Sequence, residues 1–130
     1  DPYGLRRHAL AILHILEEKG IELSLRGLVE KAASILEGYT SFTLPEGLVE
    51  EVMKFFRIRL KNDLVGRGLR PDTVEAALIA SFDEPLDAII RARALEAVRS
   101  REEFEPLAIA FKRVMNILKG MTPGELREDL

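Results

Sequence analysis

Apolar side chains recur along most of this chain every three or four residues, which is the spacing of an amphipathic α-helix. No segment shows the sustained alternation of apolar and polar residues, with β-branched enrichment, that is typical of a strand. The pattern therefore predicts an all-α fold, a single bundle of about six or seven helices.

Residues that typically begin or end a helix divide the pattern into segments. The predicted helices cover residues 5–19, 25 to about 39, 45 to about 65, 71 to about 81, 85 to about 99, 101–119, and a last one from 122. Ser24 is the predicted cap of the second helix. Capping boxes, in which a Ser or Thr and a Glu three residues later bind each other's amides, start the third helix at Thr43 and the sixth at Ser100. The last helix carries an apolar stripe, Leu126 and Leu130, without continuation, so we expect the chain to be a piece of a longer protein.

Composition narrows the class of protein. With 130 residues and 47% hydrophobic content, the chain can form one core of ordinary size, and no composition shift divides it, so residues 1–130 are predicted to be one domain. It has no cysteine, which excludes disulfides, thiolate zinc sites and cysteine nucleophiles, and favours a cytoplasmic location. The most apolar run, residues 9–16, is far shorter than the roughly 20 residues of a membrane span. We expect no membrane partner.

Charge is unevenly distributed along the chain, although the net charge is only -3. Residues 54–70 hold six cations and one acid, and residues 89–119 hold seven cations and four acids. Residues 17–51 hold eight glutamates and three cations. Because nucleic acids respond to local positive potential, the two basic regions are candidate binding surfaces. A charge-mixed, solvated surface is the alternative.

The third predicted helix places two charges inside its apolar arc. Arg59 and Asp63 lie four residues apart, close enough to touch, and a lone buried guanidinium is costly. One interpretation is a buried Arg59–Asp63 ion pair. The other is that Arg59 lies at the mouth of the bundle and contacts phosphate. The predicted core comprises Phe56, Leu60, Leu107, Phe111, Val114 and Leu118.

The sixth predicted helix has an apolar stripe and a separate polar line. Lys112, Asn116 and Lys119 share that line, with Arg113 beside it. Lysine and arginine neutralise backbone phosphates, and asparagine can both donate to and accept from a base edge. The line is therefore a candidate RNA contact. Simple solubilisation of the helix remains the alternative.

Catalytic and metal-binding patterns are absent from the sequence. His8 and His14 lie six residues apart, on different faces of a helix, so they cannot share a metal. No glycine-rich phosphate loop is present, and no serine stands in a recognisable arrangement with a histidine and an acid. We expect no catalytic residues, metal or cofactor in this chain.

Three stretches give the chain a family resemblance. They are residues 1–7 (DPYGLRR), 55–60 (FFRIRL) and 112–119 (KRVMNILK). Together, in this order and spacing, they resemble the C-terminal region of the bacterial glycyl-tRNA synthetase beta subunit. Residues 68–77 and 85–95 also run like that family, so the resemblance covers nearly the full length. Two positions depart from the family pattern: Gly4 stands where alanine is usual, and Ile58 where an acid is common.

The resemblance implies a DALR-type anticodon-binding domain that begins close to a domain boundary. Its partners would be the tRNA for glycine, the alpha subunit that carries the aminoacylation core, and other beta-subunit domains; ATP and Mg²⁺ would serve the whole enzyme. The implied tRNA contacts are Arg6, Arg7, Arg59, Arg91, Lys112, Arg113, Asn116 and Lys119, with Tyr39 or Phe42 as stacking residues. The alternative is a helical interaction module of the same enzyme without direct tRNA contact.

Overall fold

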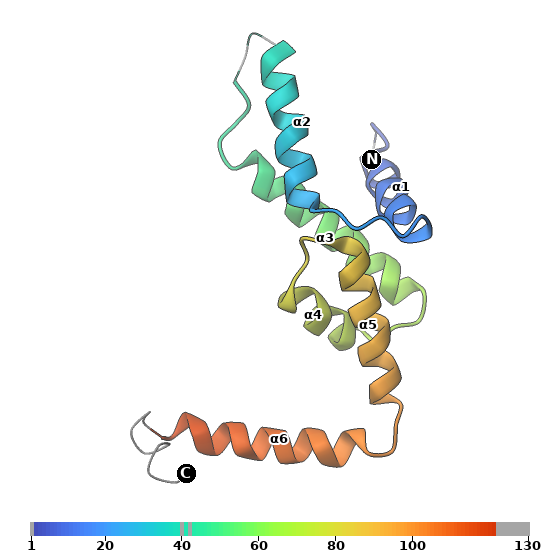
Figure 1. The fold of residues 1–130 in the computed structure, drawn as a ribbon, viewed down its shortest axis with the longest axis vertical. Coiled ribbons are helices and arrows are strands. Elements are labelled where there is room, and N and C mark those ends of the chain that lie inside the picture. Colours follow the sequence, from blue (N-terminus) through green and yellow to red (C-terminus); the bar gives the residue numbers. More distant parts are fainter. Residues whose placement is uncertain (1, 40, 42, 122–130) are drawn as a thin grey trace. The chain divides into compact units, whose positions relative to one another are not determined.

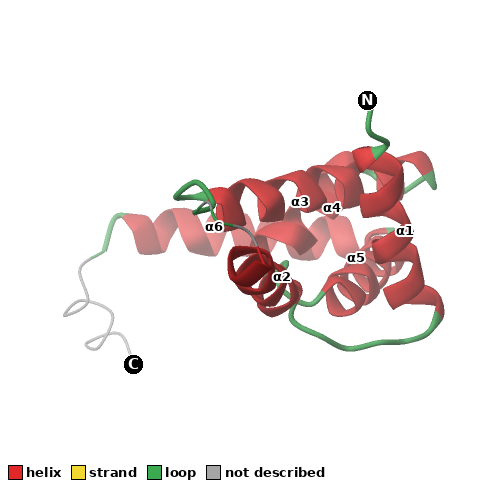
Figure 2. Ribbon diagram, turned by 90° about the horizontal axis from the view of Figure 1, so that it is seen from above, coloured by secondary structure: helices red, strands yellow, loops and turns green. Residues whose placement is uncertain are grey.

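The structure, a computed structural model of the chain, describes residues 2–39, 41 and 43–121. Within these residues it contains helices and no strand (Figure 2), which confirms the predicted all-α class. The helices are α1 (Leu5–Glu18), α2 (Leu25–Tyr39), α3 (Leu48–Gly66), α4 (Pro71–Ala80), α5 (Pro85–Arg99) and α6 (Phe104–Lys119) (Figure 1). The predicted last helix from Thr122 and the candidate stacking residue Phe42 lie outside the described residues.

The chain falls into two compact units, residues 1–96 and 97–130. The first unit contains α1 to α4 and most of α5, and the second contains the end of α5 and α6. Among the described residues, no helix is long and apolar enough to cross a membrane. That residues 1–130 form one domain stays a prediction.

The core of the first unit is built around α3. Helices α1, α2 and α4 each pack against α3. From α3, Met53, Phe56, Leu60 and Leu64 are buried, at the helical spacing expected of an inward stripe. The other buried apolar residues of this cluster are Ala9, Leu13, Leu25, Val74, Ala77, Leu78, Ala88, Ile89 and Ala92. Phe56 and Leu60 thus lie in the core, as predicted.

The start of α2 is fixed by two side chains. Ser24 caps it as predicted, because the Gly27 amide donates to Ser24 Oγ at 3.0 Å. Asp83, in the loop between α4 and α5, accepts from Ser24 Oγ at 2.9 Å and from the Arg26 amide at 3.1 Å. The Leu25 amide donates to the Asp83 carbonyl at 2.7 Å. The α4–α5 loop therefore satisfies amides that the first turn of α2 cannot pair by itself.

Both predicted capping boxes were wrong about where their helices begin. Helix α3 starts at Leu48 because Gly47, at φ 81°, has the left-handed conformation that ends a turn rather than continuing a helix. Helix α6 starts at Phe104, with Glu103 as a cap that makes no side-chain hydrogen bond. Backbone turns precede α6: the Arg101 amide donates to the Val98 carbonyl, and the Phe104 amide to the Arg101 carbonyl. Residues 101–103 thus lie in turns instead of the first turn of a helix.

In the second unit, α6 is amphipathic, and both of its faces are exposed. Leu107, Phe111 and Val114 are 66%, 65% and 52% exposed, and Leu118 is 37% exposed. The prediction that these four residues belong to the core was wrong. Helical periodicity shows that side chains share a face, but it does not show that another element of the same chain covers that face.

Candidate nucleic-acid interface

The polar line of α6 has the geometry that the sequence predicts. At 100° per residue, Lys112, Asn116 and Lys119 fall within one narrow sector of the helix, and Arg113 lies outside it. All four are exposed. From Lys112 to Lys119 the helix advances roughly 10 Å, which allows contacts to more than one phosphate of a nucleic acid strand. This is a positively charged edge that presents an amide side chain between two lysines.

Two further candidates lie on the first turn of α1. Arg6 and Arg7 are both exposed. The family departure at Gly4 is explained here, because Gly4 is the residue before the helix and has φ 69°, where glycine is unstrained. A side chain at Gly4 would also place its Cβ 3.0 Å from Arg7 Nη2.

Arg59 does not form the predicted ion pair with Asp63. Its guanidinium carbon lies 5.0 Å from the centre of the Phe55 ring, a cation–π arrangement along α3. Its Nε is buried and has no hydrogen-bond partner in the part of the chain that the structure describes. The ion-pair interpretation was wrong, and Arg59 retains donor capacity that these residues do not use.

Asp63 instead joins α3 to α1. Its carboxylate lies 3.1 Å from His14 Nε2 and 2.5 Å from Arg67 Nη2. Arg67 also donates to both carboxylate oxygens of Glu17, at 2.7 and 2.9 Å. Burial disfavours the charged form of Arg67, but the hydrogen bonds to Glu17 and Asp63 outweigh that effect and raise the pKa of the guanidinium. Arg67 was not a predicted site residue, and its contacts tie the end of α3 to α1.

We expect a double-mutant cycle to find coupling between Asp63 and Arg67, and none between Asp63 and Arg59. Asp63→Asn and Arg67→Gln should couple by about 0.5 to 1 kcal/mol, the range of a partly exposed pair. The free energy of unfolding in urea measures both cycles. Coupling of Asp63 to Arg59 that equals or exceeds its coupling to Arg67 would contradict the structure.

Arg91 contacts the end of α4. Its Nη1 donates to the carbonyls of Ala77 and Ser81, both at 3.1 Å, and its Nη2 pairs with Asp87. These carbonyls belong to the last turn of α4 and the residue after it, where helical partners are missing. Arg91 therefore joins α5 to α4. Its predicted contact with tRNA stays a prediction.

The polar side of α3 is partly neutralised by α4. Arg57 and Lys61 both pair with Glu75, and Lys54, one turn earlier, is exposed. The hydrogen bond from Lys61 lowers the pKa of the Glu75 carboxyl, burial opposes that shift, and Arg57 lowers the pKa further. The basic cluster at residues 54–61 thus presents less positive charge than its sequence suggests.

The Glu75 contacts predict a pH dependence. Because its pKa is lowered in the folded state, the ionised carboxylate stabilises the fold above its unfolded pKa of about 4.3, and that contribution is lost as the pH falls through the folded value. Wild-type protein should therefore lose more stability than Glu75→Gln between about pH 5 and pH 3. Urea unfolding at several pH values measures this. Glu22→Gln, which removes an exposed carboxylate without an ion pair in the described residues, is the control. Parallel profiles for wild type and Glu75→Gln would refute the assignment.

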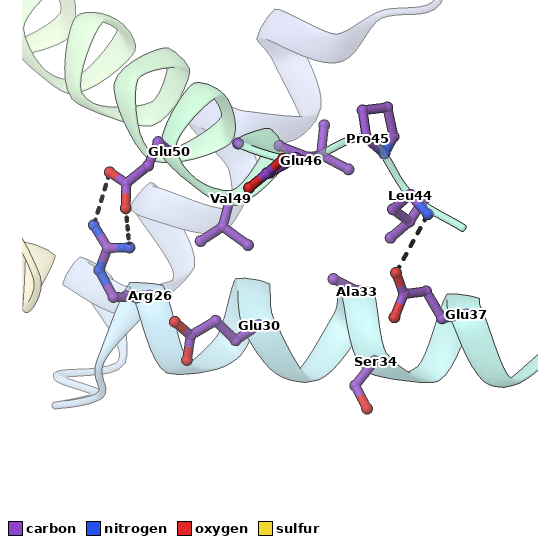
Figure 3. A pocket seen from close by; sticks show the side chains of 12 residues that line it. Arg26, Glu30, Ala33, Ser34, Glu37, Leu44, Pro45, Glu46, Val49 and Glu50 are labelled. Atoms are coloured by element: carbon purple, nitrogen blue, oxygen red, sulfur yellow. Dashed lines mark hydrogen bonds and ion pairs between the residues drawn. The ribbon is translucent and has the colours of Figure 1, made fainter.

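An acidic hollow separates α2 from the start of α3. It encloses about 500 Å³, and its lining includes Arg26, Glu30, Glu37, Glu46 and Glu50. Figure 3 shows Arg26 paired with Glu50 across it and Glu37 accepting from the Leu44 amide. The hydrogen bond from Arg26 lowers the pKa of Glu50. Four carboxylates around one hollow repel phosphate, so this part of the first unit does not suit nucleic acid.

The structure thus separates the predicted contacts into two groups. Arg6, Arg7 and the four α6 residues are exposed, whereas Arg91 is engaged within the first unit and Arg59 lies against Phe55. Tyr39, the described stacking candidate, is 88% exposed at the end of α2. Among the described residues, no three His, Asp or Glu side chains are grouped so that they could hold a metal ion.

Sequence comparisons identify the family to which these elements belong. The family model described as glycyl-tRNA synthetase beta subunit matches residues 1–79, which include α1 to α3 and nearly all of α4. The chain belongs to the glycyl-tRNA synthetase beta subunit family. The DPYGLRR and FFRIRL stretches that carried the resemblance both lie inside the matched region.

Curated relatives extend this match into the second unit. The glycine–tRNA ligase beta subunit of Syntrophotalea carbinolica is 42% identical over 120 residues, 92% of this chain. That of Trichlorobacter lovleyi is 44% identical over 120 residues, also 92% of this chain, and that of Syntrophus aciditrophicus is 40% identical over 126 residues, 97% of this chain. These alignments cover only 17%, 17% and 18% of the relatives' own lengths. The chain therefore spans about a sixth of the proteins that it matches.

Proposed function

We propose that this chain is a tRNA-binding domain of a glycine–tRNA ligase beta subunit and that it docks on the anticodon arm of the tRNA for glycine. The observation that carries the proposal is the exposed line of Lys112, Asn116 and Lys119 on α6, with Arg113 beside it. Family membership supports it, because ligation of glycine to tRNA requires a surface that recognises the tRNA. In this proposal the domain is of the DALR type and works in the cytoplasm.

The cations and the asparagine have different tasks. Lys112, Arg113 and Lys119 displace counterions from backbone phosphates, which gives affinity without sequence preference. Asn116 donates to and accepts from a base edge, which gives discrimination. Arg6 and Arg7 add phosphate contacts from α1, and Arg59 is a further candidate contact. Tyr39 offers an exposed ring for base stacking.

Ligation itself is assigned to other parts of the enzyme. The alpha subunit carries the aminoacylation core in this proposal, and the remaining beta-subunit domains join it to the tRNA-bound domain. ATP and Mg²⁺ belong to that core. The described residues fit neither group: they contain no glycine-rich phosphate loop and no cluster of metal ligands. We therefore derive no catalytic step for this chain.

A second candidate function is an interaction module that joins parts of the same enzyme without contacting tRNA. The exposed apolar face of α6, with Leu107, Phe111 and Val114, favours it. Contiguous exposed apolar side chains mark sites of protein contact more often than sites of phosphate contact.

Fluorescence anisotropy with labelled glycine tRNA tests the first proposal. The chain should bind saturably, and the logarithm of its affinity should fall linearly with the logarithm of salt concentration. An isolated anticodon stem-loop should compete for binding, whereas an acceptor-stem duplex should not. Absence of saturable binding at low salt, or equal competition by both fragments, would reject the anticodon proposal.

A further inference from the structure

The exposed apolar residues of α6 follow a heptad pattern. Their spacing alternates between three and four residues, which is the spacing of the a and d positions of a coiled coil. They are Phe104, Leu107, Phe111, Val114 and Leu118, and we call these five residues the α6 seam. The described part of the chain buries none of them. A seam of this kind packs against another helix, because each of its side chains inserts between four residues of the facing helix.

The α6 seam is complementary to a second copy of itself in the antiparallel orientation. From Leu107 to Leu118 the spacings are four, three and four residues, which read the same in both directions. A two-fold axis between residues 112 and 113 therefore places Leu107 opposite Leu118 of the second copy, and Phe111 opposite Val114. Each layer then has a similar volume. A parallel pair would instead set Phe111 against Phe111 and Val114 against Val114, in layers of unequal volume.

The residues on the two flanks of the α6 seam are complementary as well. Ala108 and Met115 lie on one flank, and Ala110 and Ile117 lie on the other. The same two-fold axis brings Ala108 beside Met115 of the second copy, and Ala110 beside Ile117. A small residue thus meets a large one on both flanks, which lets two helices pack closely without voids. All four flanking side chains are exposed and uncharged, so no like charges oppose the pairing.

We propose that α6 forms an antiparallel pair with α6 of a second copy of this chain. The helix has 16 residues and is about 24 Å long, so the interface lies at the small end of specific interfaces, which bury about 1,200 Å². Association should therefore be weak, with a dissociation constant of roughly 10 to 100 µM.

The proposed pair leaves the polar line of α6 open to solvent. At 100° per residue, Lys112, Asn116 and Lys119 all lie at least roughly 110° around the helix from the centre of the α6 seam. A tRNA could therefore contact this line while the seam is covered. The pairing does not rest on the proposed tRNA contact, and its tests contain no RNA.

Sedimentation equilibrium of the whole chain tests the pairing. Between about 2 and 300 µM, the mean mass should rise from that of one chain toward that of two. High salt should not dissociate the pair, because the α6 seam and its flanks are uncharged. A mass of one chain at every concentration would overturn the proposal and leave the seam to another partner. Growth beyond two chains would also overturn it, because a two-fold pair is closed.

Two variants of the same helix locate the interface. Phe111→Lys places a cation in the α6 seam and should raise the dissociation constant by at least about tenfold. Ile109→Lys makes the same kind of change at a 47% exposed position on the opposite side of α6, and it should leave the dissociation constant unchanged. Equal effects of the two changes would overturn the location. Circular dichroism at low concentration shows whether each variant is folded.

Cysteine crosslinking tests the orientation without adding a charge. The chain has no cysteine, so Leu107→Cys and Leu118→Cys each introduce a single thiol. In the antiparallel pair, residue 107 faces residue 118, whereas equivalent residues lie roughly 16 Å apart along the axis. A short bismaleimide should therefore crosslink a mixture of the two variants in higher yield than either variant alone. Higher yields from each variant alone would show a parallel pair and overturn the proposal.

Discussion

Replacing Leu60 by alanine is expected to lower the free energy of unfolding by about 3 to 4 kcal/mol. Leu60 is fully buried in α3, the helix against which α1, α2 and α4 all pack. Its truncation removes apolar contacts and leaves a cavity that three neighbouring helices cannot all move to fill. Urea unfolding followed by circular dichroism measures the change.

Phe111→Ala is the matched comparison. Phe111 lies on α6 and is 65% exposed, so its truncation should cost less than about 1 kcal/mol. The sequence pattern alone predicts the opposite, a loss of about 3 to 5 kcal/mol for a core phenylalanine. A larger loss for Phe111→Ala than for Leu60→Ala would contradict the structure and restore the prediction from the sequence.

The second large effect concerns tRNA affinity. The triple variant Lys112→Ala, Arg113→Ala and Lys119→Ala should weaken binding of glycine tRNA by at least about tenfold at low salt. Each lost phosphate contact should also reduce the slope of log affinity against log salt by about 1. Alanine is a good helix former, so α6 should persist in the variant. Anisotropy titrations across a salt series measure both quantities.

A second triple variant separates local contact from net charge. Lys19→Ala, Lys31→Ala and Lys54→Ala remove the same number of cations from exposed positions of the first unit. Its salt slope should stay close to that of the wild type. If both triple variants lose affinity and slope equally, the chain attracts tRNA through its total charge and the α6 line has no special role.

Asn116→Ala should behave differently from the lysine variants. Its slope should not change, because the amide displaces no counterion. The ratio of affinities for glycine tRNA and a non-cognate tRNA should fall instead.

Helix positions were predictable because they depend on local signals. Proline at the start of α4 and α5, and Ser24 before α2, act through their own backbone or the next turn, and these starts were correct. The starts of α3 and α6 were missed because Gly47 adopts a left-handed conformation before α3 and backbone turns precede α6 near Arg101. The spacing of Ser or Thr and Glu shows where a capping box is possible, but it does not show which backbone conformation those residues adopt.

Contacts between distant residues were not predictable. The helical wheel correctly placed Arg59 and Asp63 on one side of α3, but the partner of Asp63 on α1 is His14, 49 residues away. The wheel likewise identified the apolar stripe of α6 without showing that it is exposed. Nothing in the sequence indicated that Arg91 donates to the carbonyls of Ala77 and Ser81. The partner of a side chain and the exposure of an apolar face depend on which two surfaces of the fold meet. An amphipathic pattern describes only one of those two surfaces.

Crosslinking from Asn116 tests the central claim most directly. The chain has no cysteine, so Asn116→Cys provides a single attachment point for an azidophenacyl group. After irradiation with glycine tRNA, primer extension maps the crosslinked nucleotides. Attachment at Ile90→Cys, a 56% exposed position of α5, is the control. Crosslinks from residue 116 in the anticodon arm, exceeding those from residue 90, are the predicted result. Crosslinks confined to the acceptor arm, or equal low yields from both positions, would contradict the proposal that α6 contacts the anticodon arm.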